Sequence, residues 1–104
     1  MLGEQNYILD IRPSFIEELD ETVGYIERKF KNYQAADDLV EKVYAAIDAR
    51  LFAPESFQPC YKEPDVKQPY YRIGVGNFEI YYIVHDNVME VRWFRYGKSI
   101  RPLQ

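Results

Sequence analysis

Residues 70–97, YYRIGVGNFEIYYIVHDNVMEVRWFRYG, constrain the fold of this 104-residue chain more than any other segment. Three runs rich in aromatic and β-branched residues are separated by two short breakers, Gly76-Asn77 and Asp86-Asn87. Two-residue breakers of this kind favour the positive-φ turns that join antiparallel strands. The segment therefore predicts a three-stranded antiparallel meander.

Alternation along the middle run divides its side chains between two faces of the predicted sheet. One face is apolar and is assigned to the core; its residues are Phe78, Ile80, Tyr82 and Val84. The other face mixes polar and apolar side chains; its residues are Glu79, Tyr81, Ile83 and His85. We expect a mixed face of this kind either to be half covered by a partner or to form a working surface.

Two helical patterns precede the meander. Residues 7–12 read as a short first strand, and Ser14 followed by Glu17 fits a capping box at the start of a helix. Apolar residues recur at helical spacing over residues 14–30 and, after Asn32 as a cap, over residues 33–52. Two long helices with a short connection form an antiparallel hairpin.

The predicted fold is therefore α+β, in the order β-α-α-β-β-β, with the helical hairpin packed on one face of a small antiparallel sheet. Residues 53–69 hold four of the six prolines and are expected to form an irregular surface loop. The core shared by the two layers is predicted to contain Phe15, Leu19, Ile26, Val40, Val43, Ile47, Ile80, Tyr82 and Val84.

Length and composition limit the class of protein. At 104 residues the chain is expected to be one domain, 1–104, with one core. It has no long apolar segment, no signal-peptide pattern and a single cysteine, which together predict a cytoplasmic protein without disulfides. One His and one Cys at no ligand-like spacing predict no metal site, and no cofactor motif is present.

The net charge of −4 is unevenly distributed. Residues 1–57 carry 6 Lys/Arg and 12 Asp/Glu, whereas residues 58–104 carry 7 and 5. The meander and tail are thus the favoured place for an anionic partner. The alternative is that the acidic residues simply solvate the two helices.

The element order and several segments resemble the RelE/ParE superfamily of bacterial type II toxins. The resemblance covers nearly the whole chain. The family's first strand and first helix are similar to IRPSFIEELDETVGYI, and its second helix is similar to QAADDLVEKVYAAIDARL. Its final strands, with Gly and Lys after them, are similar to YYRIGVGNFEIYYIVHDNVMEVRWFRYGK. The long second helix is more similar to ParE members.

The resemblance implies a toxin that a cognate antitoxin holds inactive. ParE-like members poison DNA gyrase, and RelE-like members cut mRNA in the ribosomal A site. Cutting of this kind needs a base, an acid and cations for the phosphate, without metal. A member that has lost toxicity and acts as a binding or regulatory module is the third possibility, and an unrelated small α+β binding domain is the fourth.

The resemblance also names candidate catalytic residues, which are Arg72, Tyr96, Lys98 and Arg101. Three positions depart from the RelE pattern, because Gly74, Glu79 and Ser99 stand where basic residues are expected. A carboxylate in place of a phosphate-binding cation weakens anion binding. These departures favour a toxin that acts by binding another protein over one that cuts mRNA.

Candidate target-binding residues are Arg95, Tyr81 and Glu79. Tyr81 is expected either to stack on a base or, preferably, to pack beside Ile83. Arg92 and Arg95 are three residues apart, which on a regular strand places them on opposite faces.

The roles of four further residues are inferred from their neighbours in the sequence. Trp93 and Phe94 are adjacent and are also expected to point to opposite sides. His85, before a turn, is expected to have a structural or solvent role, and Cys60 is interpreted as a bystander thiol.

Overall fold

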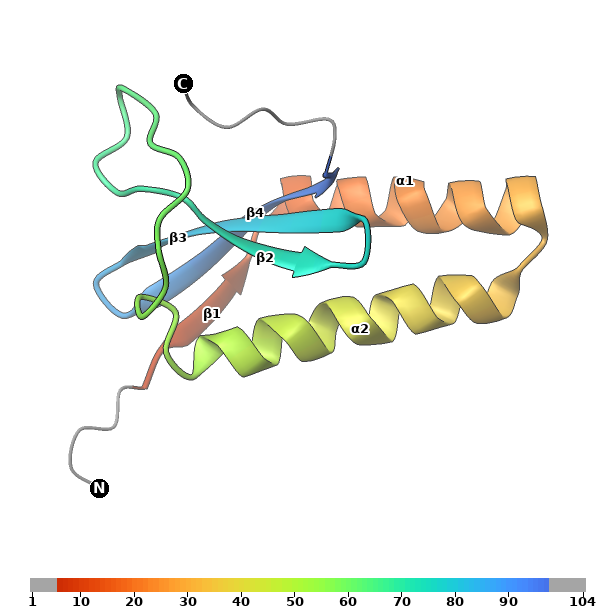
Figure 1. Cartoon of the computed structure of the whole chain (residues 1–104), viewed down its shortest axis with the longest axis horizontal. Helices are drawn as coiled ribbons and strands as arrows, with labels where there is room; N and C mark the ends of the chain where they lie inside the picture. Colours follow the sequence, from red (N-terminus) through yellow and green to blue (C-terminus); the bar gives the residue numbers. More distant parts are fainter. Residues whose placement is uncertain (1–5, 98–104) are drawn as a thin grey trace.

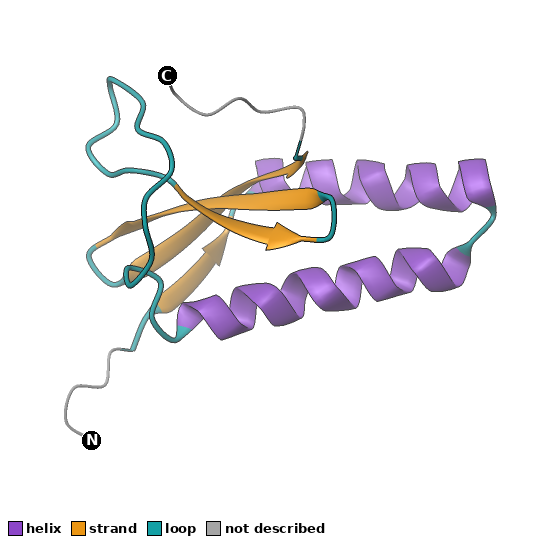
Figure 2. Ribbon diagram, in the orientation of Figure 1, coloured by secondary structure: helices purple, strands orange, loops and turns teal. Residues whose placement is uncertain are grey.

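The helices and strands follow one another in the predicted order. The computed structural model describes residues 6–97. Strand β1 spans Ile8–Ile11, helices α1 and α2 span Pro13–Phe30 and Tyr33–Leu51, and strands β2, β3 and β4 span Tyr71–Val75, Phe78–His85 and Val88–Tyr96. Figure 1 shows the helices as an antiparallel hairpin beside the sheet. The α+β architecture is therefore confirmed, and residues 52–70 form the predicted irregular loop (Figure 2).

The sheet is mixed and not purely antiparallel, which corrects one part of the prediction. Its strand order is β1-β4-β3-β2, and β1 pairs with β4 in parallel, with Ile8 opposite Val88 and Ile11 opposite Val91. The helical hairpin and the meander separate these two strands in the chain. A connection of this length allows parallel pairing, which a short turn does not.

Both predicted hairpin turns are present. Gly76 has a φ of 59° between β2 and β3, and Asp86 has a φ of 55° between β3 and β4. Gly accepts this left-handed conformation without a steric cost, and Asp tolerates it better than most residues. The three-stranded meander is thus confirmed, with β3 paired to β2 on one side and to β4 on the other.

The start of α1 differs from the predicted capping box. Its N-cap is Arg12, Pro13 occupies the first turn, and no side chain caps the helix. The Ser14 hydroxyl instead donates a 2.7 Å hydrogen bond to the carbonyl oxygen of Arg92 in β4. Ser14 therefore binds a distant strand and does not cap its own helix. At α2 the predicted cap is confirmed, because the Asn32 side chain accepts a 3.0 Å hydrogen bond from the backbone N–H of Ala35.

The core lies between the helices and the inner face of the sheet. Seven of the nine predicted core residues are buried there, and Met89, Val91 and Phe94 of β4 join them. The edge-to-face contact between Phe15 and Phe94, with ring centroids 5.9 Å apart, connects α1 to β4. The buried residues of the predicted set are Phe15, Leu19, Val43, Ile47, Ile80, Tyr82 and Val84.

The two other predicted core residues, Ile26 and Val40, are only partly buried and do not belong to the core cluster. Ile26 lines an open groove between α1 and the ends of β3 and β4, and the helical hairpin extends past the end of the sheet (Figure 1). On α2, Leu39 packs against the core while its neighbour Val40 does not. Helical periodicity predicted the apolar stripe correctly, but not where the opposing layer ends.

Truncation of Ile80 tests the assignment of the two sheet faces. Ile80 is fully buried, so Ile80→Ala should lower the free energy of unfolding by about 2–5 kcal/mol in urea denaturation. Ile8→Ala, at a side chain that is 56% exposed, is the matched control and should cost much less. A loss below about 0.5 kcal/mol for Ile80→Ala would show that the assigned faces are exchanged.

Candidate functional site

The chain's own loop covers part of the outer face of the sheet, which is the face that points away from the helices. Tyr70, Tyr81 and Ile83 are buried in a second apolar cluster, with Cys60, Tyr61 and Trp93 packed against them. The loop is closed by two backbone hydrogen bonds between residues 60–61 and Tyr70. The mixed face of β3 is therefore covered in part by loop residues of the same chain, which is neither the partner nor the open working surface that the sequence predicted.

Three of the predicted site residues meet on this face. The Arg72 guanidinium lies 3.8 Å from the Glu79 carboxylate, and the Tyr81 hydroxyl donates a 2.7 Å hydrogen bond to the same carboxylate. Arg72 and Tyr81 face each other across β2 and β3 in the antiparallel register. The positive charge of Arg72 is therefore compensated within the chain, which weakens any attraction for a phosphate.

The hydroxyl of Tyr81 is poorly suited to acid–base chemistry. Burial and the hydrogen bond to Glu79 raise the pKa of Tyr81 to about 12. A general base for a ribose hydroxyl works best with a pKa near the operating pH, so Tyr81 does not fit that role. Its ring is only 2% exposed, which agrees with the packing alternative and leaves no ring face for a nucleobase.

Tyr96, a further candidate catalytic residue, does not join Arg72. Tyr96 contacts Phe78 on the helix side of the sheet, with ring centroids 5.9 Å apart, and it lines a groove beside α1. Lys98 and Arg101 lie outside the described residues. Among residues 6–97, the structure thus brings Arg72 together with Glu79 and Tyr81 but not with Tyr96.

A β-bulge in β4 changes the faces predicted for its cations. The pairing with β3 shifts by one residue between Tyr81 and Tyr82, opposite Trp93 and Val91, so Arg92 is the extra residue. An extra residue restarts the alternation of side chains. Consequently Arg92 and Arg95 lie on the same outer face, contrary to the prediction. Trp93 and Phe94 lie on opposite faces, as predicted, and the structure places Trp93 outward and Phe94 inward.

Arg95 is held by helix α1. Its guanidinium lies 2.6 Å from one carboxylate oxygen of Glu18, whose other oxygen accepts a 2.8 Å hydrogen bond from the backbone N–H of Phe94. The same guanidinium stands 5.0 Å from the centre of the Trp93 ring. This predicted target-binding residue therefore has a structural partner that sequence analysis missed, since nothing local links Glu18 to residues 94–95.

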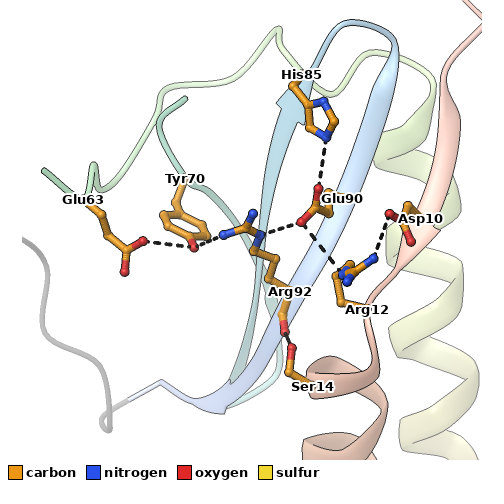
Figure 3. A network of polar contacts seen from close by, with 8 residues as sticks. All are labelled: Asp10, Arg12, Ser14, Glu63, Tyr70, His85, Glu90 and Arg92. Carbon is orange, nitrogen blue, oxygen red and sulfur yellow. Dashed lines mark hydrogen bonds and ion pairs between the residues drawn. The ribbon is translucent and has the colours of Figure 1, made fainter. Parts of the chain in front are cut away.

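A network of charged and polar side chains surrounds the bulge (Figure 3). Glu90 is its centre, because it contacts Arg92 at 2.7 Å, His85 at 3.0 Å and Arg12 at 4.0 Å. Arg92 also donates a 2.9 Å hydrogen bond to the Tyr70 hydroxyl, which ties the loop to β4. Figure 3 extends the network to two further carboxylates, Asp10 and Glu63.

The pKa shifts of Glu90 and Arg92 favour the charged forms of these two residues. Burial alone would raise the pKa of Glu90, but hydrogen bonds from Arg92 and His85 outweigh it and hold that pKa below its ordinary value. Likewise, burial disfavours the charge of Arg92, yet Glu90 and Tyr70 raise its pKa. A histidine beside a carboxylate has the composition of an acid–base pair, but here the carboxylate is already bound by two arginines. The network therefore ties strands and loop together.

Sequence analysis missed Glu90 and Tyr70 as members of this network. The one available signal was the alternation of Glu90 and Arg92 on one strand, two residues apart and therefore on one face.

Burial raises the pKa of the Cys60 thiol, in agreement with a bystander role. Within residues 6–97, no group of three His, Cys, Asp or Glu side chains is placed to hold a metal ion. The helices of the described part are too short or too polar to cross a bilayer.

An open groove of about 530 Å³ lies on the other side of the molecule, between α1 and the ends of β3 and β4. Its floor and walls are mainly apolar, and several of these side chains are exposed. Exposed apolar surface of this kind is typical of interaction sites. The residues that line the groove are Glu21, Thr22, Tyr25, Ile26, Arg28, Phe30, Phe78 and Tyr96.

The role of Glu90 can be tested through the pH dependence of stability. Because its pKa is lowered in the folded state, its carboxylate stabilises the fold above the ordinary carboxyl pKa and loses that effect as pH falls through the lowered pKa. Glu90→Gln should therefore cost about 1.5–3 kcal/mol at pH 7. The difference from the wild type should shrink toward pH 3, measured by urea denaturation at each pH.

The exposed Glu17→Gln is the matched control and should show a small, nearly pH-independent change. A constant difference between wild type and Glu90→Gln from pH 7 to pH 3 would contradict a charge-dependent role of Glu90.

Comparisons with known proteins agree with the fold and identify the family. No curated protein sequence matches the chain. Among solved structures, the crystal structure of an archaeal RelE–RelB complex from Pyrococcus horikoshii OT3 contains a similar fold, with a TM-score of 0.52 and 16% sequence identity. The match covers 92% of this chain and 100% of that one. The family described as "ParE toxin of type II toxin-antitoxin system, parDE" matches residues 9–98. This chain is thus a member of the ParE toxin family of type II toxin–antitoxin systems.

Proposed function

We propose that this toxin inhibits growth by binding a protein target, DNA gyrase, without cutting mRNA, and that a cognate antitoxin neutralises it. The observation that carries the proposal is the arrangement around Arg72. Within residues 6–97, the one candidate catalytic cation is paired with Glu79, and burial and the hydrogen bond to Glu79 raise the pKa of the adjacent Tyr81 hydroxyl to about 12. An exposed phosphate would have to compete with Glu79 for Arg72.

Membership of the ParE family supports gyrase as the target, because the resemblance assigns gyrase poisoning to ParE-like members. Action through a protein surface requires no catalytic set. It requires exposed side chains that a partner can bury, and the groove beside α1 together with the far end of the helical hairpin offers such side chains.

The groove is our proposed docking site for the antitoxin. Its apolar lining fits apolar side chains of a partner segment, and the carboxylates of Glu17, Glu18, Asp20 and Glu21 lie on the first half of the same helix. An antitoxin segment with apolar anchors and basic flanks complements this surface. The solved neighbour, a RelE–RelB complex, supports a two-protein assembly for this fold.

Expression of the chain without a partner tests the function. Growth of bacteria should slow, and co-expression of the product of the adjacent reading frame should restore it. Purified toxin should inhibit supercoiling by gyrase in a plasmid assay. Unchanged growth with soluble, folded protein would favour the non-toxic binding or regulatory alternative.

Arg72→Ala separates the proposal from the mRNA endonuclease alternative. Since the Arg72–Glu79 pair is partly exposed, its loss should change stability by less than about 1 kcal/mol and leave growth inhibition intact. If the chain is a ribosome-dependent endonuclease, removal of one phosphate contact should slow cleavage by about 10²–10³-fold. Cleavage of ribosome-bound mRNA by purified wild type, lost in Arg72→Ala, would overturn the proposal; Arg72→Lys is the charge-retaining control.

A further inference from the structure

The connection between the two helices protrudes from the rest of the molecule. Figures 1 and 2 show that α1 and α2 extend well past the end of the sheet and join at their far end. Four exposed side chains surround this connection, and we name them the hairpin tip: Lys29, Phe30, Lys31 and Tyr33. Phe30 and Tyr33 are 61% and 60% exposed, because no layer of the described structure covers them.

The sign of the charge reverses at this end of the hairpin. Residues 25–33 contain three Lys or Arg and one Glu, a net charge of +2. Residues 13–24 before them carry −4, and residues 34–51 after them carry −2. None of the ion pairs within residues 6–97 includes Lys29 or Lys31. The hairpin tip is therefore an uncompensated positive spot on an otherwise acidic pair of helices.

The backbone of Lys31 provides an independent observation. Lys31 ends α1 with a φ of 52° and a ψ of 35°, the left-handed conformation in which helices usually place Gly or Asn. Only one other non-glycine residue within residues 6–97 has a positive φ, Asp86, and the hairpin turn accounts for it. A lysine here strains the backbone. Within residues 6–97, no ion pair of the Lys31 side chain explains why lysine stands in this place.

We propose that the hairpin tip binds an acidic patch on the surface of the toxin's protein target. This inference rests on the proposed function, because it assigns the contact through which the toxin acts. Phe30 and Tyr33 supply apolar area that the target buries, and Lys29 and Lys31 supply the charge that orients the complex. Phe30 also lines the groove, so a segment seated there covers part of the same surface.

A protein patch fits the hairpin tip better than a nucleic acid does. Two lysines next to two aromatic rings are compatible with either partner. A nucleic acid, however, presents phosphates along its whole length, and the acidic stretches on both sides of the tip repel them. A compact acidic patch avoids these stretches.

Lys31→Gly is the most informative variant, because it relaxes the backbone while it removes the side chain. Its melting temperature should equal or exceed that of the wild type. Its inhibition of growth, and of gyrase supercoiling, should weaken by about tenfold. Lys31→Arg should retain both effects. Lys42→Ala, which removes an exposed lysine from α2 away from the tip, should match the wild type.

Three results decide the inference. Full growth inhibition by a folded double variant, Lys29→Ala with Lys31→Gly, would overturn it. Binding of a 20-nucleotide single-stranded DNA by the wild type, lost in Lys31→Gly, would overturn the choice of a protein patch. If wild type slows growth but leaves gyrase untouched, while Lys31→Gly relieves growth inhibition, the gyrase proposal fails and the assignment of the hairpin tip is supported.

Discussion

The hydrogen bonds along strand β4 hold the two layers of this toxin together. One edge of β4 pairs with β3, but β1 reaches along the other edge only as far as Val91. Beyond that residue α1 takes over, because Ser14 donates to the carbonyl of Arg92 and Glu18 accepts from the N–H of Phe94. An unpaired backbone group in a partly buried strand is costly, so these bonds fix the position of the helix on the sheet.

The same strand determines which polar groups are free. The bulge at Arg92 turns that residue toward the outer face, where Glu90 and Tyr70 bind it. Arg95 is bound by Glu18, and Arg72 by Glu79. The outer face thus contains many charged side chains, yet each of these cations has a partner within the chain. A sheet of this kind is stabilised by its charges and offers few of them to a substrate.

Exposed apolar surface is found instead where α1 and α2 extend beyond the end of the sheet. Side chains of the hairpin's far half, such as Phe30 and Tyr33, follow the apolar stripes of α1 and α2 but have no opposing layer. In a monomer this exposure is unfavourable, because apolar area remains in water. In the complexes proposed above, burial of the same exposed area supplies binding energy.

The sequence alone was sufficient for the meander, both helices, the Asn32 cap and most of the core, because these depend on periodicity, turn residues and caps within a few neighbours. It did not predict the parallel pairing of β1, the partner of Ser14, the partly exposed Ile26 and Val40, or the shared face of Arg92 and Arg95. For the site, it named Arg72, Glu79 and Tyr81 but not that they bind one another. These features were decided only by the tertiary structure, since each depends on which distant segment lies opposite: a strand register, a bulge or the end of a layer. A local sequence pattern determines the periodicity of a helix or strand, but it does not determine how far the layer packed against that helix or strand extends.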